Sequence, residues 1–106
     1  MMRFARPKKE KMASGDDCIE LTEEGSWESF PSFAEKFVQQ IGAEVIDKTE
    51  TEGTHLWKIE YGGVILNFVY SDYPNGVSIE PTDSNATEAI DRLFGLVSQQ
   101  SHADGL

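Results

Sequence analysis

Alternating polar and apolar residues mark two adjacent segments, 54–61 and 64–70, as β-strands. Gly62-Gly63 separates them, and a two-residue glycine connection is typical of a tight hairpin. Such a turn fixes the register, and residues opposite each other share a face of the sheet. One face is then almost wholly aromatic and aliphatic, and we expect it to pack on helices. Its predicted pairs are Tyr61 with Val64, Ile59 with Leu66, Trp57 with Phe68, and His55 with Tyr70.

The other face of this hairpin is mixed, and it is our candidate interface. Leu56, Ile65 and Val69 supply an apolar stripe there, and contiguous exposed apolar patches often mark interfaces. The alternatives are that scattered aliphatic residues on a sheet face are normal, or that the N-terminal segment folds over them. The predicted pairs on this face are Glu60 with Ile65, Lys58 with Asn67, and Leu56 with Val69.

Apolar residues recur at spacings of three and four before Gly42, as on one face of an amphipathic helix. Gly42 supplies the left-handed residue that ends such a helix. The helix begins between Trp27 and Ser32, because Pro31 suits a first turn while Ser32 with Glu35 fits a capping box. We expect the apolar face to lie in the core; its members are Trp27, Phe30, Phe33, Ala34, Phe37, Val38 and Ile41.

Helical spacing returns near the C-terminus. Asn85, with Glu88 three residues later, is the predicted cap of this second helix. The chain is expected to fray from Gln99 onward. The apolar face comprises Ala86, Ala89, Ile90, Leu93, Phe94 and Val97.

Three shorter strands complete the predicted fold: Cys18–Thr22, Ala43–Lys48 and Val77–Glu80. The resulting order is β-α-β-β-β-β-α, an α+β fold with a mostly antiparallel sheet. We expect a two-layer sandwich with both helices on one face. Residues 17–100 form the single domain, between a disordered basic tail at 1–16 and a frayed C-terminus at 101–106.

Charge is unevenly distributed along the 106 residues, whose formal net charge is −10. Residues 1–11 carry a net +4 and residues 12–106 a net −14. Met12 is an alternative start of the chain, in which case residues 1–11 are not part of the natural product. The acidic body disfavours nucleic acid and favours a basic protein partner, although the same charge also serves solubility. Self-association is the other interaction that we consider.

No segment resembles a membrane span or an export signal. A membrane-crossing helix needs about 20 apolar residues, whereas the longest apolar run, Val64–Leu66, ends at Asn67. The basic N-terminus is followed by polar residues rather than an apolar stretch. We therefore expect a cytoplasmic protein without membrane contact.

Candidate catalytic chemistry reduces to one pair, Cys18 and His55, because no known catalytic, nucleotide-binding or metal-binding motif is present. Cys18 is the single cysteine, so an internal disulfide is excluded. The more ordinary interpretation makes Cys18 a small buried thiol. His55 then stacks on Tyr70 with one ring nitrogen in water. We expect no cofactor, no metal and no catalytic residue.

Four short motifs stand out in the sequence: Trp27-x-x-Phe30-Pro31-x-Phe33-Ala34, Ile41-Gly42-Ala43, His55-x-Trp57 and Leu66-Asn67-Phe68. They resemble a small uncharacterised gammaproteobacterial family, a domain of unknown function, over about residues 20–98. The resemblance implies a bacterial cytoplasmic protein and carries over no catalytic residue. Three functions stay open: a non-enzymatic acidic binding or adaptor protein, a homodimer similar to immunity proteins or chaperones, and a small enzyme using Cys18 and His55.

Overall fold

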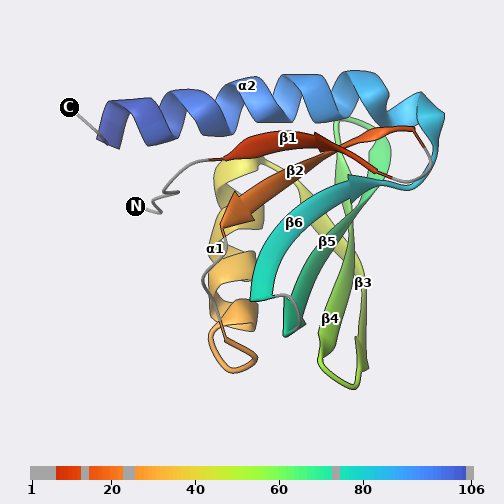
Figure 1. The fold of residues 1–106 in the computed structure, drawn as a ribbon, viewed down its shortest axis with the longest axis vertical. Coiled ribbons are helices and arrows are strands. Elements are labelled where there is room, and N and C mark those ends of the chain that lie inside the picture. Colours follow the sequence, from red (N-terminus) through yellow and green to blue (C-terminus); the bar gives the residue numbers. More distant parts are fainter. Residues whose placement is uncertain (1–6, 13–14, 23–25, 73–74, 105–106) are drawn as a thin grey trace.

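An antiparallel sheet and two α-helices make up the structure, a computed structural model that describes residues 7–12, 15–22, 26–72 and 75–104 (Figure 1). The six strands of these residues follow the order β1-β2-β6-β5-β4-β3. Helix α1 spans Phe30–Ile41, and a short 3₁₀ turn, Ser84–Ala86, precedes helix α2, Thr87–Asp104. The strands are β1 Lys8–Lys11, β2 Asp17–Thr22, β3 Glu44–Thr51, β4 Thr54–Tyr61, β5 Val64–Asp72 and β6 Asn75–Pro81.

The α+β class and the antiparallel sheet are confirmed, but the element order begins with a strand that we did not expect. Residues 8–11 form β1 instead of belonging to a disordered tail. All four of its residues are exposed, so its sequence carries no apolar alternation that could reveal a strand. At the other end, α2 continues to Asp104, into the segment expected to fray, because neither glycine nor proline interrupts residues 96–104.

The predicted hairpin is confirmed residue by residue. Strands β4 and β5 pair in the expected register, with Trp57 opposite Phe68 on one face and Lys58 opposite Asn67 on the other. The two-residue turn has positive φ at both glycines, 59° at Gly62 and 83° at Gly63. A hairpin turn of this hand matches the twist of the flanking strands, and glycine adopts it without steric penalty.

Helix α1 begins within the predicted range, but the expected capping box is wrong. Its N-cap is Ser29, whose side chain makes no capping hydrogen bond, and Pro31 lies in the first turn. Proline suits this position because its missing N–H has no helical partner there in any case. Gly42 ends the helix as predicted, with a φ of 74°.

Helix α2 also begins differently from the prediction. Asn85 lies in the 3₁₀ turn and is not the cap; its amide donates to Asp83 Oδ1 at 2.9 Å. Asp83 therefore accepts a hydrogen bond at the 3₁₀ turn that precedes the helix. The predicted turn residues Tyr73 and Pro74 lie outside the described residues.

One buried cluster joins both helices to the sheet. Phe30 and Phe37 of α1 and Ile90 and Leu93 of α2 belong to it, and all four are at most 2% exposed. Alternate residues of β2, β4, β5 and β6 complete it, so each of these strands directs one face into the core. The strand members are Ile19, Leu21, Trp57, Ile59, Tyr61, Leu66, Phe68, Tyr70, Val77 and Ile79.

Candidate functional site

The candidate interface lies on the sheet face opposite the core, which we call the open face. Its six predicted residues alternate with core residues along β4 and β5, and the register brings them together. Four of them are half-buried and two, Lys58 and Glu60, are exposed. The half-buried residues are Leu56, Ile65, Asn67 and Val69.

The apolar stripe on this face is interrupted. Leu56 lies directly opposite Val69, but the Lys58–Asn67 pair separates them from Ile65. Four strand residues correspond to about 13 Å, so Ile65 and Val69 form two apolar points and not one continuous patch. Between them, Asn67 Oδ1 is enclosed and accepts no hydrogen bond among the described residues.

An acidic flank of three glutamates, Glu10, Glu20 and Glu80, borders the open face on β1, β2 and β6. Glu10 lies opposite Cys18, Glu20 opposite Ser78, and Glu80 opposite Asn67. Burial raises the pKa of the Cys18 thiol, and Glu80, Glu10, Glu20 and Asp17 raise it further by charge repulsion. The raised pKa of the thiol therefore indicates a negative electrostatic potential around Cys18. A cation that binds there would make this potential less negative.

Cys18 and His55 are not brought together. Strands β6 and β5 lie between β2 and β4, and these three inter-strand spacings alone separate the two residues by at least about 14 Å. Cys18 neighbours Ile19 of the core face in sequence and so points to the open face, whereas His55 points into the core. A nucleophile and its base need hydrogen-bond contact, so this geometry excludes direct cooperation between them.

His55 is more enclosed than we expected. Its side chain is 1% exposed and is as buried as the side chains of the core residues, so the prediction of a ring nitrogen in water is wrong. The ring stacks on Trp27 with centroids 3.8 Å apart, and Nε2 lies 3.0 Å from the Trp27 carbonyl oxygen. Nδ1 lies 3.2 Å from Glu50 Oε2 but makes no hydrogen bond. These contacts make His55 a structural residue that joins the segment before α1 to β4.

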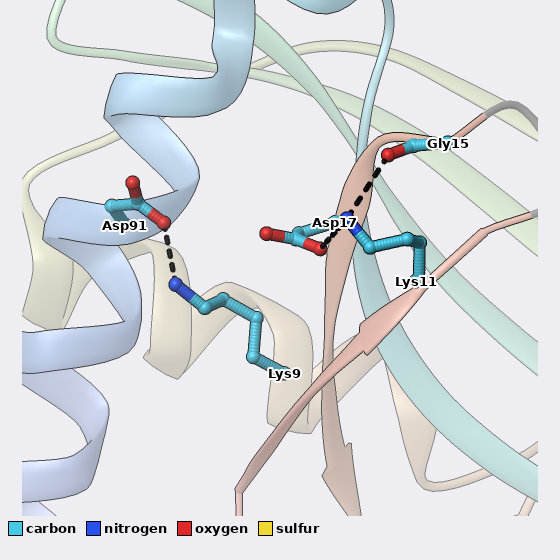
Figure 2. Close-up of polar contacts among 5 residues, drawn as sticks. All are labelled: Lys9, Lys11, Gly15, Asp17 and Asp91. Atoms are coloured by element: carbon cyan, nitrogen blue, oxygen red, sulfur yellow. Dashed lines mark hydrogen bonds and ion pairs between the residues drawn. The ribbon is translucent and has the colours of Figure 1, made fainter.

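Strand β1 carries polar contacts that the sequence interpretation missed. Lys9 Nζ donates to Asp91 Oδ1 of α2 at 2.6 Å (Figure 2). Lys11 Nζ lies 3.4 Å from both Asp17 Oδ1 and the Gly15 carbonyl oxygen. The hydrogen bond to Asp91 raises the pKa of Lys9, and the negative charges of Asp91 and Asp17 add to that effect.

Comparison with known proteins identifies a family. The model of a family described as "Protein of unknown function (DUF3630)" matches residues 8–100. No curated protein and no solved structure shows significant similarity. Within the described residues, no group of three or more His, Cys, Asp or Glu side chains is arranged to hold a metal ion. No helix of that part of the chain is long and apolar enough to cross a membrane.

Proposed function

The chain belongs to DUF3630, a family of unknown function, and we propose from the geometry of the structure that it is a binding or adaptor protein whose open face receives a basic protein. The observation that carries the proposal is the placement of the apolar points beside the acidic flank. Leu56, Val69 and Ile65 offer apolar contact, and the glutamates that raise the pKa of Cys18 offer charge. Interfaces commonly combine an apolar centre with a charged surround.

The proposal treats the protein as two layers, with both helices on the core side of the sheet. The single buried cluster shared by α1, α2 and alternate strand residues supports this arrangement. It would leave the open face available for contact. A cytoplasmic location is part of the proposal, and the single cysteine is compatible with it.

Charge complementarity favours a basic partner over a second copy. The net charge of −10 attracts a basic protein over several ångströms. Two copies meeting through their open faces would instead bring two acidic flanks together. Homodimer formation is therefore the second candidate, and it is the one that salt should strengthen.

Salt dependence separates these candidates. Sedimentation velocity and affinity capture from the native host would be run at about 50 mM and about 500 mM salt, where screening differs strongly. We expect the protein to sediment as a monomer at both salt concentrations. We also expect it to capture basic proteins at low salt and to release them at high salt. Self-association that grows with salt would instead support the homodimer.

Two variants test whether the open face is the contact surface. Ile65→Asp places a charge on it and should reduce capture. Ile46→Asp is the matched control, because Ile46 is 51% exposed on β3 and is not one of the six interface residues. Both variants should keep the thermal stability of the original chain within about 1 kcal/mol. Capture that is unaffected by Ile65→Asp would remove the proposal.

A further inference from the structure

Strand β1 is attached to the domain without contributing to its core. It pairs with β2 at four positions, from Lys8 opposite Glu20 to Lys11 opposite Asp17. All four β1 residues are exposed, and none belongs to the buried cluster. The next strand, β2, is different, because its Ile19 and Leu21 are fully buried. The core therefore ends at β2.

The side-chain contacts that hold β1 are electrostatic. Lys9 joins it to Asp91 and also lies 5.6 Å above the ring of Phe94. Lys11 joins it to Asp17 (Figure 2). Ion pairs at a solvent-exposed surface stabilise weakly and are screened by salt. Strand β1 can therefore detach from β2 while the core stays folded, and this local opening costs little free energy.

Strand β1 fits the edge of β2 imperfectly in two respects. In the continued register, Pro7 comes opposite Leu21, and proline has no N–H to donate to a strand ladder. The second mismatch is Glu10, an acid within the acidic flank that raises the pKa of Cys18. A segment with a cation in place of Glu10 and no proline would pair over more of β2 and meet a favourable potential.

We propose that the edge of β2 is a docking site for an extended Lys/Arg-rich segment of a partner protein, which adds as an antiparallel strand and displaces β1. The main chain of β2 would supply the hydrogen bonds. Asp17, Asp91 and the two glutamates of the acidic flank that stay in place, Glu20 and Glu80, would select cations. Strand β1 itself, with three lysines in four residues, shows the chemistry that this edge accepts. The site goes beyond the proposed function, because a strand added at the edge of β2 forms it and the apolar points of the open face take no part; only Glu20 and Glu80 border both surfaces.

A disulfide lock tests displacement in the full chain. Glu10 lies directly opposite Cys18, and the Cα atoms of such pairs are about 4.5–5.5 Å apart, within disulfide range. Glu10→Cys therefore allows β1 to be fixed on β2 by oxidation and released by reduction. Lys8→Cys is the matched control, because it faces Glu20 and gives Cys18 no partner.

The probe is a dye-labelled peptide of residues 7–12 that carries Pro7→Thr and Glu10→Lys, with binding followed by fluorescence anisotropy. We expect reduced Glu10→Cys to bind it at least about tenfold more tightly than the oxidised form, which keeps β1 in place. The Lys8→Cys control should bind equally under both conditions. A peptide of the same charge with N-methylated backbone amides should bind neither form.

Equal affinity in the oxidised and reduced forms would overturn the proposal, as would binding of the N-methylated peptide, which would indicate charge attraction alone. Hydrogen exchange on the unmodified chain gives an independent check. Amides of β1 should exchange at least about a hundredfold faster than those of Leu66 and Phe68, because local opening precedes global unfolding. Exchange of β1 as slow as that of β5 would also overturn it. Ile65→Asp should leave peptide binding unchanged, so this test and that of the open face can fail separately.

Discussion

Trp57 and Phe68 lie directly opposite each other on the core face of β4 and β5, and the ring of Phe30 packs edge-on against both. The centroid of Phe30 is 5.4 Å from that of Trp57 and 5.2 Å from that of Phe68. This arrangement fastens α1 to the hairpin. Perpendicular aromatic contacts add stabilisation beyond the area that they bury.

Trp57→Ala should therefore destabilise the fold by about 3–5 kcal/mol, because the surrounding rings cannot close a cavity of that size. Lys48 would also lose its contact with the indole, over which its Nζ lies at 4.3 Å. Urea unfolding measures the loss. Ile46→Ala is the control and should change stability by less than about 0.5 kcal/mol. An unchanged midpoint for Trp57→Ala would mean that the core face is wrongly assigned.

The hairpin was predictable because two independent features of the sequence agree on its register. Gly62-Gly63 fixes the turn, and the alternation of Trp57, Ile59, Leu66 and Phe68 fixes the buried face. The same alternation assigns the six candidate interface residues to the open face. The predicted register also put the Lys58–Asn67 pair between the apolar points, and the structure confirms it.

Strand β1 could not be predicted from pattern, because an exposed edge strand needs no apolar alternation. Its most specific contact joins Lys9 to Asp91, 82 positions apart in the sequence. The environment of His55 was misjudged for a similar reason. Its closest ring partner, Trp27, comes from the segment before α1 and not from the paired strand.

His55 is the second target, since its ring and its nitrogens contribute separately. His55→Ala removes the stack on Trp27 and should cost about 2–4 kcal/mol. His55→Phe keeps a ring but leaves the Trp27 carbonyl without its partner, and should cost about 1–2 kcal/mol. Calorimetric unfolding compares the two variants. Equal losses would show that the aromatic stack contributes nothing.

Cys18 should react slowly with thiol reagents. Its raised pKa, caused by burial and then by the surrounding carboxylates, lowers the thiolate fraction at pH 8 below that of free cysteine. The same shift disfavours the thiolate of the folded protein, so it removes stability only at alkaline pH. Stopped-flow labelling measures the rate. Glu80→Gln should accelerate it by removing the strongest of the repulsive charges, whereas labelling of the original chain faster than free cysteine would contradict the assigned environment.

Attachment of β1 should be lost in alkaline solution. The pKa of Lys9 is raised above its usual value of 10.5 by the hydrogen bond to Asp91. A group whose pKa is higher in the folded state stabilises fully below its unfolded value and loses that contribution as pH rises through the folded value. Carbon-13 Cα shifts of β1 should therefore stay strand-like through neutral pH and move toward coil values only above the usual lysine pKa.

Lys9→Arg is the matched control for this titration, because the guanidinium group of arginine stays protonated up to about pH 12. The variant can still donate to Asp91, so its β1 shifts should remain strand-like over the range in which those of the original chain change. Asp91→Asn should instead loosen β1 already at neutral pH, since it removes the charge that Lys9 meets at 2.6 Å. The same alkaline midpoint in the original chain and in Lys9→Arg would show that Lys9 does not hold the strand.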